Sequence, residues 1–437
     1  MTQDKQLRIC VVGAGKRFLS GISYYTLHLV NALARSHKVS VILMRQLLPV
    51  RFYPGRKRVG MNLTQLEYDP TVQVFDGVDW YWLPSILRSL IFLMHEHPDV
   101  VVFQWWSGTV LHSYLLLALA ARMLRARVVI EFHEVLDTGE AKLPLVQPYV
   151  RFVAPLMVRL ANGFIIHSEY DREMLQRYYG LEKRSVTLIP HGPYNHYKLT
   201  DERQEHRTAP TTCCNLLFFG VIRPYKGLED LIMAFDALPE DEIAKYWLTI
   251  VGEIWEGWTL PINLIERSRY RNRITFVNRY VSDAEAAQFF AGADAVVLPY
   301  HRSSTSGPLH IAMSCGLPVV VTRVGGLIEA VASYEGAILV PPEDPATLQS
   351  ALSRVERARG KRYADPHSWE RTSARYQALF NAICSSDSSV SPLPEEVYHG
   401  AKQLNRASAA SSDSSNQPRI SFSKKRRSES YKEEMRR

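Results

Sequence analysis

The sequence contains no cysteine pair in the Cys-x-x-Cys spacing, no long uninterrupted apolar run and no recognisable nucleic-acid motif. Five cysteines occur, and they are Cys10, Cys213, Cys214, Cys315 and Cys384. This odd and irregularly spaced set indicates neither a zinc site nor a disulfide framework. We therefore expect small buried thiols in a reducing compartment.

The longest apolar segment extends from about Val110 to Leu124, but it contains His112 and Ser113 and is flanked by Arg125. It is too short and too polar for a membrane span, and we expect a buried helix there. The first residues, Met1 to Arg8, are polar and lack the pattern of a signal peptide. We therefore expect a cytoplasmic protein.

The charge of the chain is only mildly unbalanced. The formal net charge is +8 over 437 residues, with 46% hydrophobic and 22% charged residues. This composition is that of an ordinary globular protein with room for two or three domains. The positive balance suits an anionic substrate or an anionic membrane surface. Without a supporting motif it does not predict a nucleic-acid-binding protein.

Short apolar runs alternate with helical patterns, which indicates parallel, doubly wound sheets. One series of strands runs from Leu7 to Pro190 and a second from Asn215 to Val340. The predicted parts are a first domain over 1–197, a polar linker over 198–212, a second domain over 213–366 and a last helix over 368–384 capped by Ser368.

Residues 385–437 have a different composition, rich in Ser, Asp, Asn and Ala, and we predict a disordered tail. The tail carries a basic cluster at Lys424 to Arg427. A solvated charge run is the first interpretation, and weak attachment to an anionic membrane surface is the alternative.

The most informative stretch is 295–326. The apolar run from Ala295 to Leu298 predicts a buried parallel strand, and a loop rich in Ser and Thr follows it. Pro308 suits the first turn of a helix that Ser306 or Thr305 would cap. Free backbone N–H groups and the helix dipole would then face the end of the strand. The pattern predicts an anion site, most simply for a diphosphate.

A second basic loop follows the strand that ends at Gly220. Arg223 and Lys226 lie between that strand and a helix beginning after Gly227, at the edge where open α/β sheets bind ligands. A guanidinium and an ammonium together suit a diphosphate. A solvated basic turn is the alternative, and the anion site near Pro308 favours the first interpretation.

Three segments carry a family resemblance: Phe218 to Gly227, Ala291 to Tyr300, and Ala312 to Val320 followed by Gly325-Gly326. Together with Ile189 to Gly192 they resemble the retaining glycosyltransferases of family 4 (group 1), over about residues 7–384. The resemblance implies a GT-B fold, in which two Rossmann-like domains face a cleft and the last helix crosses back onto the first domain. It also implies a nucleotide-sugar donor on the second domain, an acceptor on the first, and neither a cofactor nor an obligatory metal.

The resemblance assigns roles to individual residues. Arg223 and Lys226 would hold the donor diphosphate, although the family arginine usually occupies the position of Val221. His133 would lie near the anomeric centre, with His167 as the fallback and a structural strand-end histidine as the alternative. The residues expected to bind the donor are Gly21, Arg223, Lys226, Glu253, Ser303, Thr305, Ser306 and Gly307, and those expected on the acceptor side are Trp105, Trp106 and His167.

One departure from the family is large. The family signature has two glutamates where this chain has Ser303 and Ile311, and an isoleucine cannot accept a hydrogen bond from a ribose. Glu253 or Glu256 could take over that contact, because both follow the strand ending at Val251.

The predicted function is therefore transfer of a sugar from a nucleotide-sugar to a glycan or lipid-linked acceptor with retention, in polysaccharide or glycoconjugate synthesis. The alternatives are a catalytically degenerate GT-B protein that binds a glycan or partner, and a nucleotide-sugar epimerase. Peripheral contact with the inner face of a membrane would fit a lipid-linked acceptor.

Overall fold

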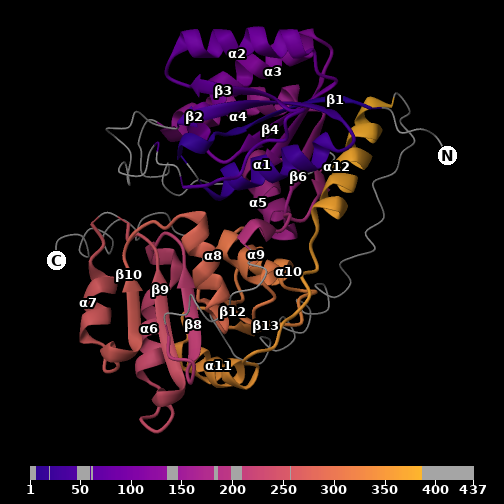
Figure 1. Ribbon diagram of the computed structural model, residues 1–437. Helices are drawn as coiled ribbons and strands as arrows, with labels where there is room; N and C mark the ends of the chain where they lie inside the picture. Colours follow the sequence, from indigo (N-terminus) through magenta and orange to yellow (C-terminus); the bar gives the residue numbers. More distant parts are fainter. Residues whose placement is uncertain are drawn as a thin grey trace, which may run out of the picture. The chain divides into compact units, whose positions relative to one another are not determined.

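The fold is described by a computed structural model that covers residues 6–18, 20–46, 60, 63–134, 146–181, 186–197, 209–255 and 257–385. The strands form two sheets, and every strand pair is parallel. The strand orders are β3-β2-β1-β4-β5-β6-β7 and β10-β9-β8-β11-β12-β13 (Figure 1). Both are doubly wound orders, so the predicted pair of Rossmann-like domains is confirmed.

The first sheet carries helices on both faces because its strands present apolar side chains on both faces of the sheet. Cys10 and Val12 pack on one face with α2, α3 and α4, whereas Ile9 and Val11 pack on the other with α1 and α12. This alternation follows from the two-residue period of a strand. The strands are β1 (Arg8–Ala14), β2 (Lys38–Gln46), β3 (Gln73–Asp79), β4 (Val100–Trp105), β5 (Arg127–Phe132), β6 (Gly163–Ile166) and β7 (Val186–Leu188). The helices are α1 (Gly21–Ala34), α2 (Leu83–Glu96), α3 (Leu111–Met123), α4 (Val146–Leu160) and α5 (Glu169–Tyr179).

The second sheet follows the same plan. Leu217 and Val296 face α8 and α9, and Leu216 and Val297 face α6 and α11. Its strands are β8 (Cys214–Phe219), β9 (Tyr246–Val251), β10 (Ile274–Val277), β11 (Ala295–Leu298), β12 (Val319–Thr322) and β13 (Ala337–Val340). Its helices are α6 (Leu228–Asp236), α7 (Leu260–Arg267), α8 (Asp283–Ala291), α9 (Gly307–Ser314), α10 (Leu327–Ala330) and α11 (Pro345–Arg357).

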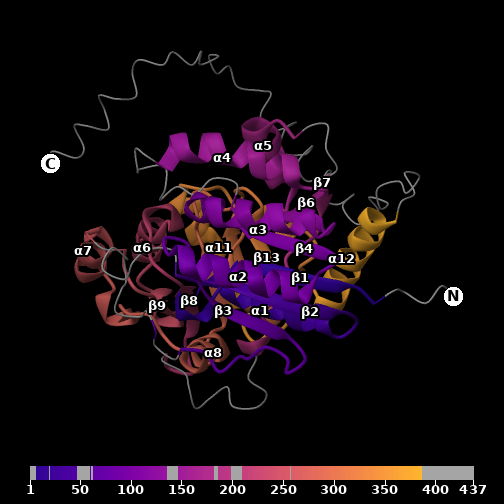
Figure 2. The same cartoon turned by 90° about the horizontal axis from the view of Figure 1, so that it is seen from above.

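The last helix, α12 (Trp369–Cys384), packs on the first domain beside α1 (Figures 1 and 2). Ser368 caps it by accepting a hydrogen bond from the backbone N–H of Arg371. The Trp369 indole donates to the carbonyl oxygen of Pro193 at 2.9 Å, and the Tyr376 hydroxyl lies 2.9 Å from that of Tyr25. The last helix therefore contributes side chains to the first domain.

The helix predicted near Val110 to Leu124 is confirmed as α3, but it is buried on one face only. It buries Leu117 and Ala121, whereas Leu119 is 44% and Met123 85% exposed. The strand β3 and the helix α2 were not foreseen. Within the described ranges, no helix combines the length and the apolarity needed to cross a membrane. The predictions for residues 198–208 of the linker, for Glu256 and for 386–437 lie outside the described residues.

Candidate functional site

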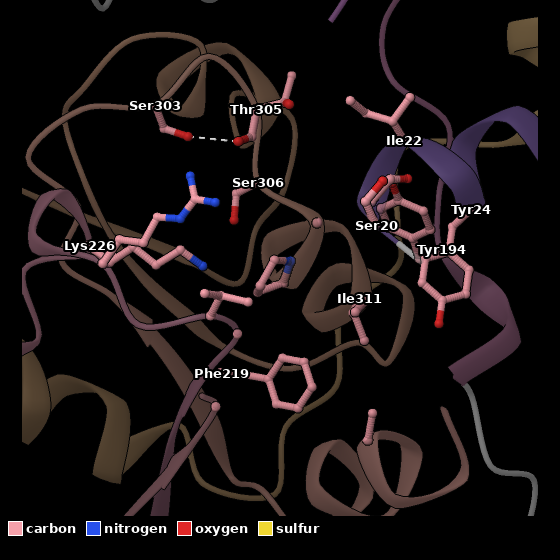
Figure 3. Close-up of a pocket in the computed structure, with 18 of the residues that line it drawn as sticks. Ser20, Ile22, Tyr24, Tyr194, Phe219, Lys226, Ser303, Thr305, Ser306 and Ile311 are labelled. Atoms are coloured by element: carbon pink, nitrogen blue, oxygen red, sulfur yellow. Dashed lines mark hydrogen bonds between the residues drawn. The ribbon is translucent and has the colours of Figure 1, made fainter. Parts of the chain in front are cut away.

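A cavity of about 370 Å³ is lined by residues of both domains. It lies where the strand order reverses in each sheet, beyond the carboxyl ends of β1 and of β8 and β11. Such switch points leave a crevice between diverging loops. In Figure 3, Lys226 enters from one side, whereas Ser20, Ile22 and Tyr24 lie on the other. Of the predicted site residues, those lining the cavity are Gly21, His133, Arg223, Lys226, Ser303, Thr305, Ser306 and Gly307.

Lys226 and Arg223 form the basic side of the cavity. Lys226 is only 8% exposed, and its ammonium lies 5.3 Å from the ring centroid of Tyr300. Burial, helped by the nearby charge of Arg223, lowers the pKa of Lys226 to about 7. The guanidinium of Arg223 stacks 4.2 Å from the ring centroid of Trp255. A buried ammonium with a lowered pKa gains most from an anion that enters beside it.

Glycines allow this basic loop to approach its neighbours. A Cβ on Gly220 would lie 2.9 Å from the Lys226 ammonium, and one on Gly227 would lie 2.0 Å from the carbonyl oxygen of Pro299. Gly227 also has φ +62°, in the left-handed region that glycine tolerates best. The turn therefore packs directly against the end of β11.

The hydroxyl-rich loop meets the cavity at the start of α9, as the sequence predicted. Ser306 is the N-cap and accepts a hydrogen bond from the backbone N–H of Leu309. Ser303 donates its hydroxyl to the carbonyl oxygen of Thr305 at 2.7 Å (Figure 3). A Cβ on Gly326 would lie 2.1 Å from the carbonyl oxygen of Ser304, so the turn next to this loop requires a glycine at position 326. Pro308 has no N–H and the N–H of Leu309 is taken by the cap, so the start of α9 offers an anion the N–H of Gly307 and the helix dipole.

His133 stands at the end of β5, on the first-domain side of the cavity, and belongs to a buried polar network. Its Nε2 lies 3.8 Å from the Glu131 carboxylate, and His167 Nε2 lies 3.5 Å from the same group. Gln104 and Tyr376 also donate hydrogen bonds to Glu131. Both imidazole Nε2 atoms lack a hydrogen-bond partner among the described residues. The Glu131 carboxylate therefore lies behind His133, and the His133 ring borders the cavity.

Several imidazoles in this region are neutral. Burial, with the neighbouring His167 and His191, holds the pKa of His133 well below its usual value. The rings of His191 and His310 stack at 4.5 Å, and burial lowers the pKa of both in the same way. A neutral His133 can accept or donate one hydrogen bond to a sugar hydroxyl without adding charge.

Glu131, His133 and His167 also form a group whose ligand atoms lie within 4.8 Å of one another. The donor types would suit a transition metal. Gln104 and Tyr376 also donate to this carboxylate, which occupies two of its roughly four acceptor sites. The group lies behind the cavity, because Glu131 and His167 do not line it.

Carboxylates are few among the described residues that line the cavity: Glu134 comes from the first domain and one other from the second. Ile311 lines the cavity where the family has a glutamate, and Glu253 does not line it. Asp283, at the first position of α8, does line it, and sequence reasoning missed this residue. Its Oδ1 accepts hydrogen bonds from Tyr24 of α1 and from Tyr197, whereas Oδ2 has no partner among the described residues. The only sequence signal was the capping box of Ser282 and Glu285, which fixes Asp283 in a first helical turn.

The residues predicted on the acceptor side lie elsewhere. Trp105 and Trp106 are 3% and 6% exposed and belong to the core beneath α3, and His167 lies behind His133; none of the three lines the cavity. Tyr194 does line it, and its hydroxyl donates to the carbonyl oxygen of Gly21 at 2.8 Å. The loop between the domains thus contacts the first residue of α1.

Comparison with known proteins covers both domains. A model of glycosyltransferase family 4 matches residues 19–193, and one described as glycosyl transferases group 1 matches residues 213–357. D-inositol 3-phosphate glycosyltransferase 2 of Catenulispora acidiphila is 28% identical over 47% of this chain and 51% of that protein. O-antigen chain mannosyltransferase B of Escherichia coli is 28% identical over 35% of this chain and 42% of that protein. The chain thus spans about half the length of these curated relatives.

A solved structure shares the fold. Anabaena HepE in complex with UDP matches with a TM-score of 0.57 at 16% identity, over 93% of this chain and 100% of that one. At this identity the likeness shows the two-domain architecture.

Proposed function

Since this chain belongs to the glycosyltransferases of family 4 (group 1), we propose that it transfers a sugar from a nucleotide-sugar donor to a glycan or lipid-linked acceptor, with retention of anomeric configuration. The supporting observation is the basic side of the cavity, where Arg223, Lys226 and the start of α9 meet. Three independent sources of positive potential at one point suit a diphosphate leaving group.

The chemistry follows from the charge that develops on the diphosphate as the glycosidic bond breaks. Lys226, Arg223 and the N–H of Gly307 at the start of α9 stabilise that charge. Because they are built into the fold before the reaction, little reorganisation is needed at the transition state. The departing phosphate oxygen can itself take the acceptor proton, so this scheme needs no second carboxylate and no metal.

The first domain supplies the surroundings of the sugar. The neutral imidazole of His133 faces the cavity from β5, and Glu131 and His167 lie behind it. Gly21 lets the turn before α1 approach the donor closely. The hydrogen bond from Tyr24 to Asp283 joins the two domains beside the cavity.

The test is a screen of nucleotide-sugars with product detection by mass spectrometry, beginning with UDP-sugars because the HepE structure of the same fold holds UDP. The Lys226→Ala variant should lose transfer by roughly two to three orders of magnitude, as loss of a transition-state charge contact does. Lys245→Ala, which removes a half-exposed lysine of the second domain, is the matched control. Turnover of Lys226→Ala equal to that of the control would refute the phosphate assignment.

One observation favours a second candidate, a degenerate protein that binds without catalysis: Ile311 and Ser303 stand where the family has glutamates. Calorimetry with nucleoside diphosphates separates the two. A protein that binds none of them at millimolar concentration is no transferase. A protein that binds UDP and rearranges the donor sugar without any acceptor is an epimerase.

A further inference from the structure

The helix α2 is apolar on two opposite faces. One face, with Ile86 and Leu93, packs into the core of the first domain. The other carries Leu83, Leu87 and Ile91, which are 58%, 50% and 62% exposed, and Met94 at 50%. Their spacing of four, four and three residues places these side chains in one stripe. A helix that is apolar towards both the core and the solvent has one face left to cover.

The stripe is continued by two neighbouring helices. Contacts join α2 to α3 and α3 to α4, and the three helices form one layer over the sheet (Figures 1 and 2). Leu119 and Met123 of α3 and Phe152 of α4 are 44%, 85% and 75% exposed. Most of the exposed large apolar side chains among the described residues belong to this layer and to the turn that leads into it. Monomeric proteins rarely leave so much contiguous apolar surface without a partner.

The charges of the same layer have one dominant sign. The three helices contain Arg88, Arg122, Arg151 and Arg159, and their only carboxylate is Glu96. Glu96 is paired with His95. Apolar side chains bordered by arginines suit the boundary between lipid headgroups and acyl chains, where the apolar groups enter and the cations meet anionic headgroups. A second copy of this chain packed through the same face would set its arginines, such as Arg88 and Arg151, against those of the first copy, and like charges facing one another disfavour that contact.

We infer that the outer face of α2, α3 and α4, defined by Leu83, Leu87, Ile91, Met94, Met123 and Phe152, rests on an anionic lipid surface. Trp82, 59% exposed, stands at the start of α2, which follows the carboxyl end of β3. That is the edge of the first sheet at which the cavity lies. The contact therefore brings the cavity side of the first domain towards the bilayer. This inference about lipid contact does not depend on the proposed sugar transfer.

The experiment is sedimentation of the full chain with vesicles of phosphatidylglycerol and phosphatidylcholine, compared with vesicles of phosphatidylcholine alone. Wild type should sediment with the anionic vesicles, less at high salt. The double variant Leu87→Glu and Ile91→Glu should lose roughly tenfold or more in partitioning, because two carboxylates would enter the lipid boundary in place of two apolar side chains of the stripe. The control pair Met233→Glu and Leu260→Glu, at side chains of the second domain that are 46% and 45% exposed, should bind like wild type.

Two further variants locate the charge contribution. Arg88→Gln with Arg151→Gln should reduce the preference for anionic over neutral vesicles while leaving the melting temperature unchanged. Replacing Lys424 to Arg427 by glutamine should leave most of the binding, which separates this face from the basic cluster of the tail.

The inference is overturned if wild type ignores anionic vesicles, or if the Leu87→Glu and Ile91→Glu variant binds as well as the control pair. It is also overturned if ultracentrifugation shows a dimer that the same variant dissociates, since a second copy would then cover the face. Nucleotide-sugar turnover, measured on every variant in detergent-free buffer, reports separately on the proposed function.

Discussion

The carboxylate of Glu131 lies 3.5 Å from Nε2 of His167, at the centre of the first domain. Nδ1 of His167 lies 2.9 Å from the carbonyl oxygen of Ile189, which can only accept a hydrogen bond. Nδ1 must therefore carry a proton, and Nε2 faces the carboxylate. Glu131 also accepts hydrogen bonds from Gln104 and Tyr376. The pair lies buried behind His133.

Replacing Glu131 by glutamine should break this link without changing the volume. The amide replaces one acceptor oxygen by a donor, which would face the hydrogen that Gln104 or Tyr376 donates. We expect the free energy of unfolding to fall by about 3 kcal/mol, typical of removing one member of a buried pair, and transfer to slow because His133 loses its support. Urea titration and turnover measurements test this. Glu370→Gln, at an exposed ion pair with Arg35, should change stability by less than ~1 kcal/mol; equal stability of the two variants would contradict the prediction.

Acid should destabilise the protein as pH falls below the usual histidine range. Burial lowers the folded-state pKa of His133, His191 and His310, and takes that of His28 to about 4. Below about pH 6.5 the unfolded chain therefore binds protons that the folded chain does not, so stability falls with pH, by at most about 1.4 kcal/mol per histidine and pH unit. Urea titrations from about pH 7 to about pH 5 measure the slope. His191→Asn should flatten it, whereas the exposed His95→Asn should not.

Nucleotide affinity should weaken as pH rises through 7. The pKa of Lys226 is lowered to about 7 in the free protein, so above that pH a diphosphate must draw in a proton when it binds. The Kd for UDP should then increase by up to about tenfold per pH unit. Measuring above pH 7 avoids the titration of the terminal phosphate, whose second pKa is about 6.

The matched variants for this prediction are Lys226→Gln and Lys226→Arg. The Lys226→Gln variant should bind UDP weakly, with a Kd that does not depend on pH. The Kd of the Lys226→Arg variant should also be independent of pH, because arginine stays charged. A Kd for wild type that is flat from about pH 7 to about pH 9 would rule out the coupling.

Gly326 should not tolerate alanine, although its φ of −71° is ordinary. A Cβ would lie 2.1 Å from the carbonyl oxygen of Ser304 and 3.0 Å from the hydroxyl oxygen of Ser168. The turn must then move away from the hydroxyl-rich loop, and we expect a stability loss of about 1–3 kcal/mol together with weaker UDP binding. Gly77→Ala, whose Cβ would meet only a ring carbon of Phe75 at 3.9 Å, is the control. Similar melting temperatures and UDP affinities for the two variants would show that the turn has room.

The sequence predicted those parts of the site whose signals are local. Pro308 and Ser306 specify the start of α9 through a fixed φ and a side-chain cap, and the glycines at Gly220 and Gly227 mark the basic turn. By contrast, β3 is an edge strand whose Gly77 and Asp76 interrupt any apolar run, and α2 is apolar on two faces. The strand does not show the two-residue alternation of apolar and polar residues, and the helix does not show a single apolar stripe, so neither element was foreseen.

Aromatic residues were the least predictable. Trp105 and Trp106 suggest a sugar-stacking surface by composition, but they pack beneath α3. Tyr24 shows no distinctive local pattern, yet its hydroxyl reaches Asp283 in the other domain. A side chain's exposure depends on which element packs over it, and the residue type does not indicate which element that is.

By itself, the sequence determined two parallel α/β domains, a family and the two loops that meet at the cavity, because apolar periodicity, glycine, proline and helix caps act over a few residues. The tertiary structure alone decided that Glu131, His167 and Tyr376 meet behind His133, that Asp283 instead of Glu253 reaches the cavity from the second domain, and that α2 to α4 leave an apolar face uncovered. These outcomes depend on strand order and on α12 crossing to the first domain, which bring together groups far apart in the chain. Burial at those meeting points then sets the pKa values on which the chemistry depends.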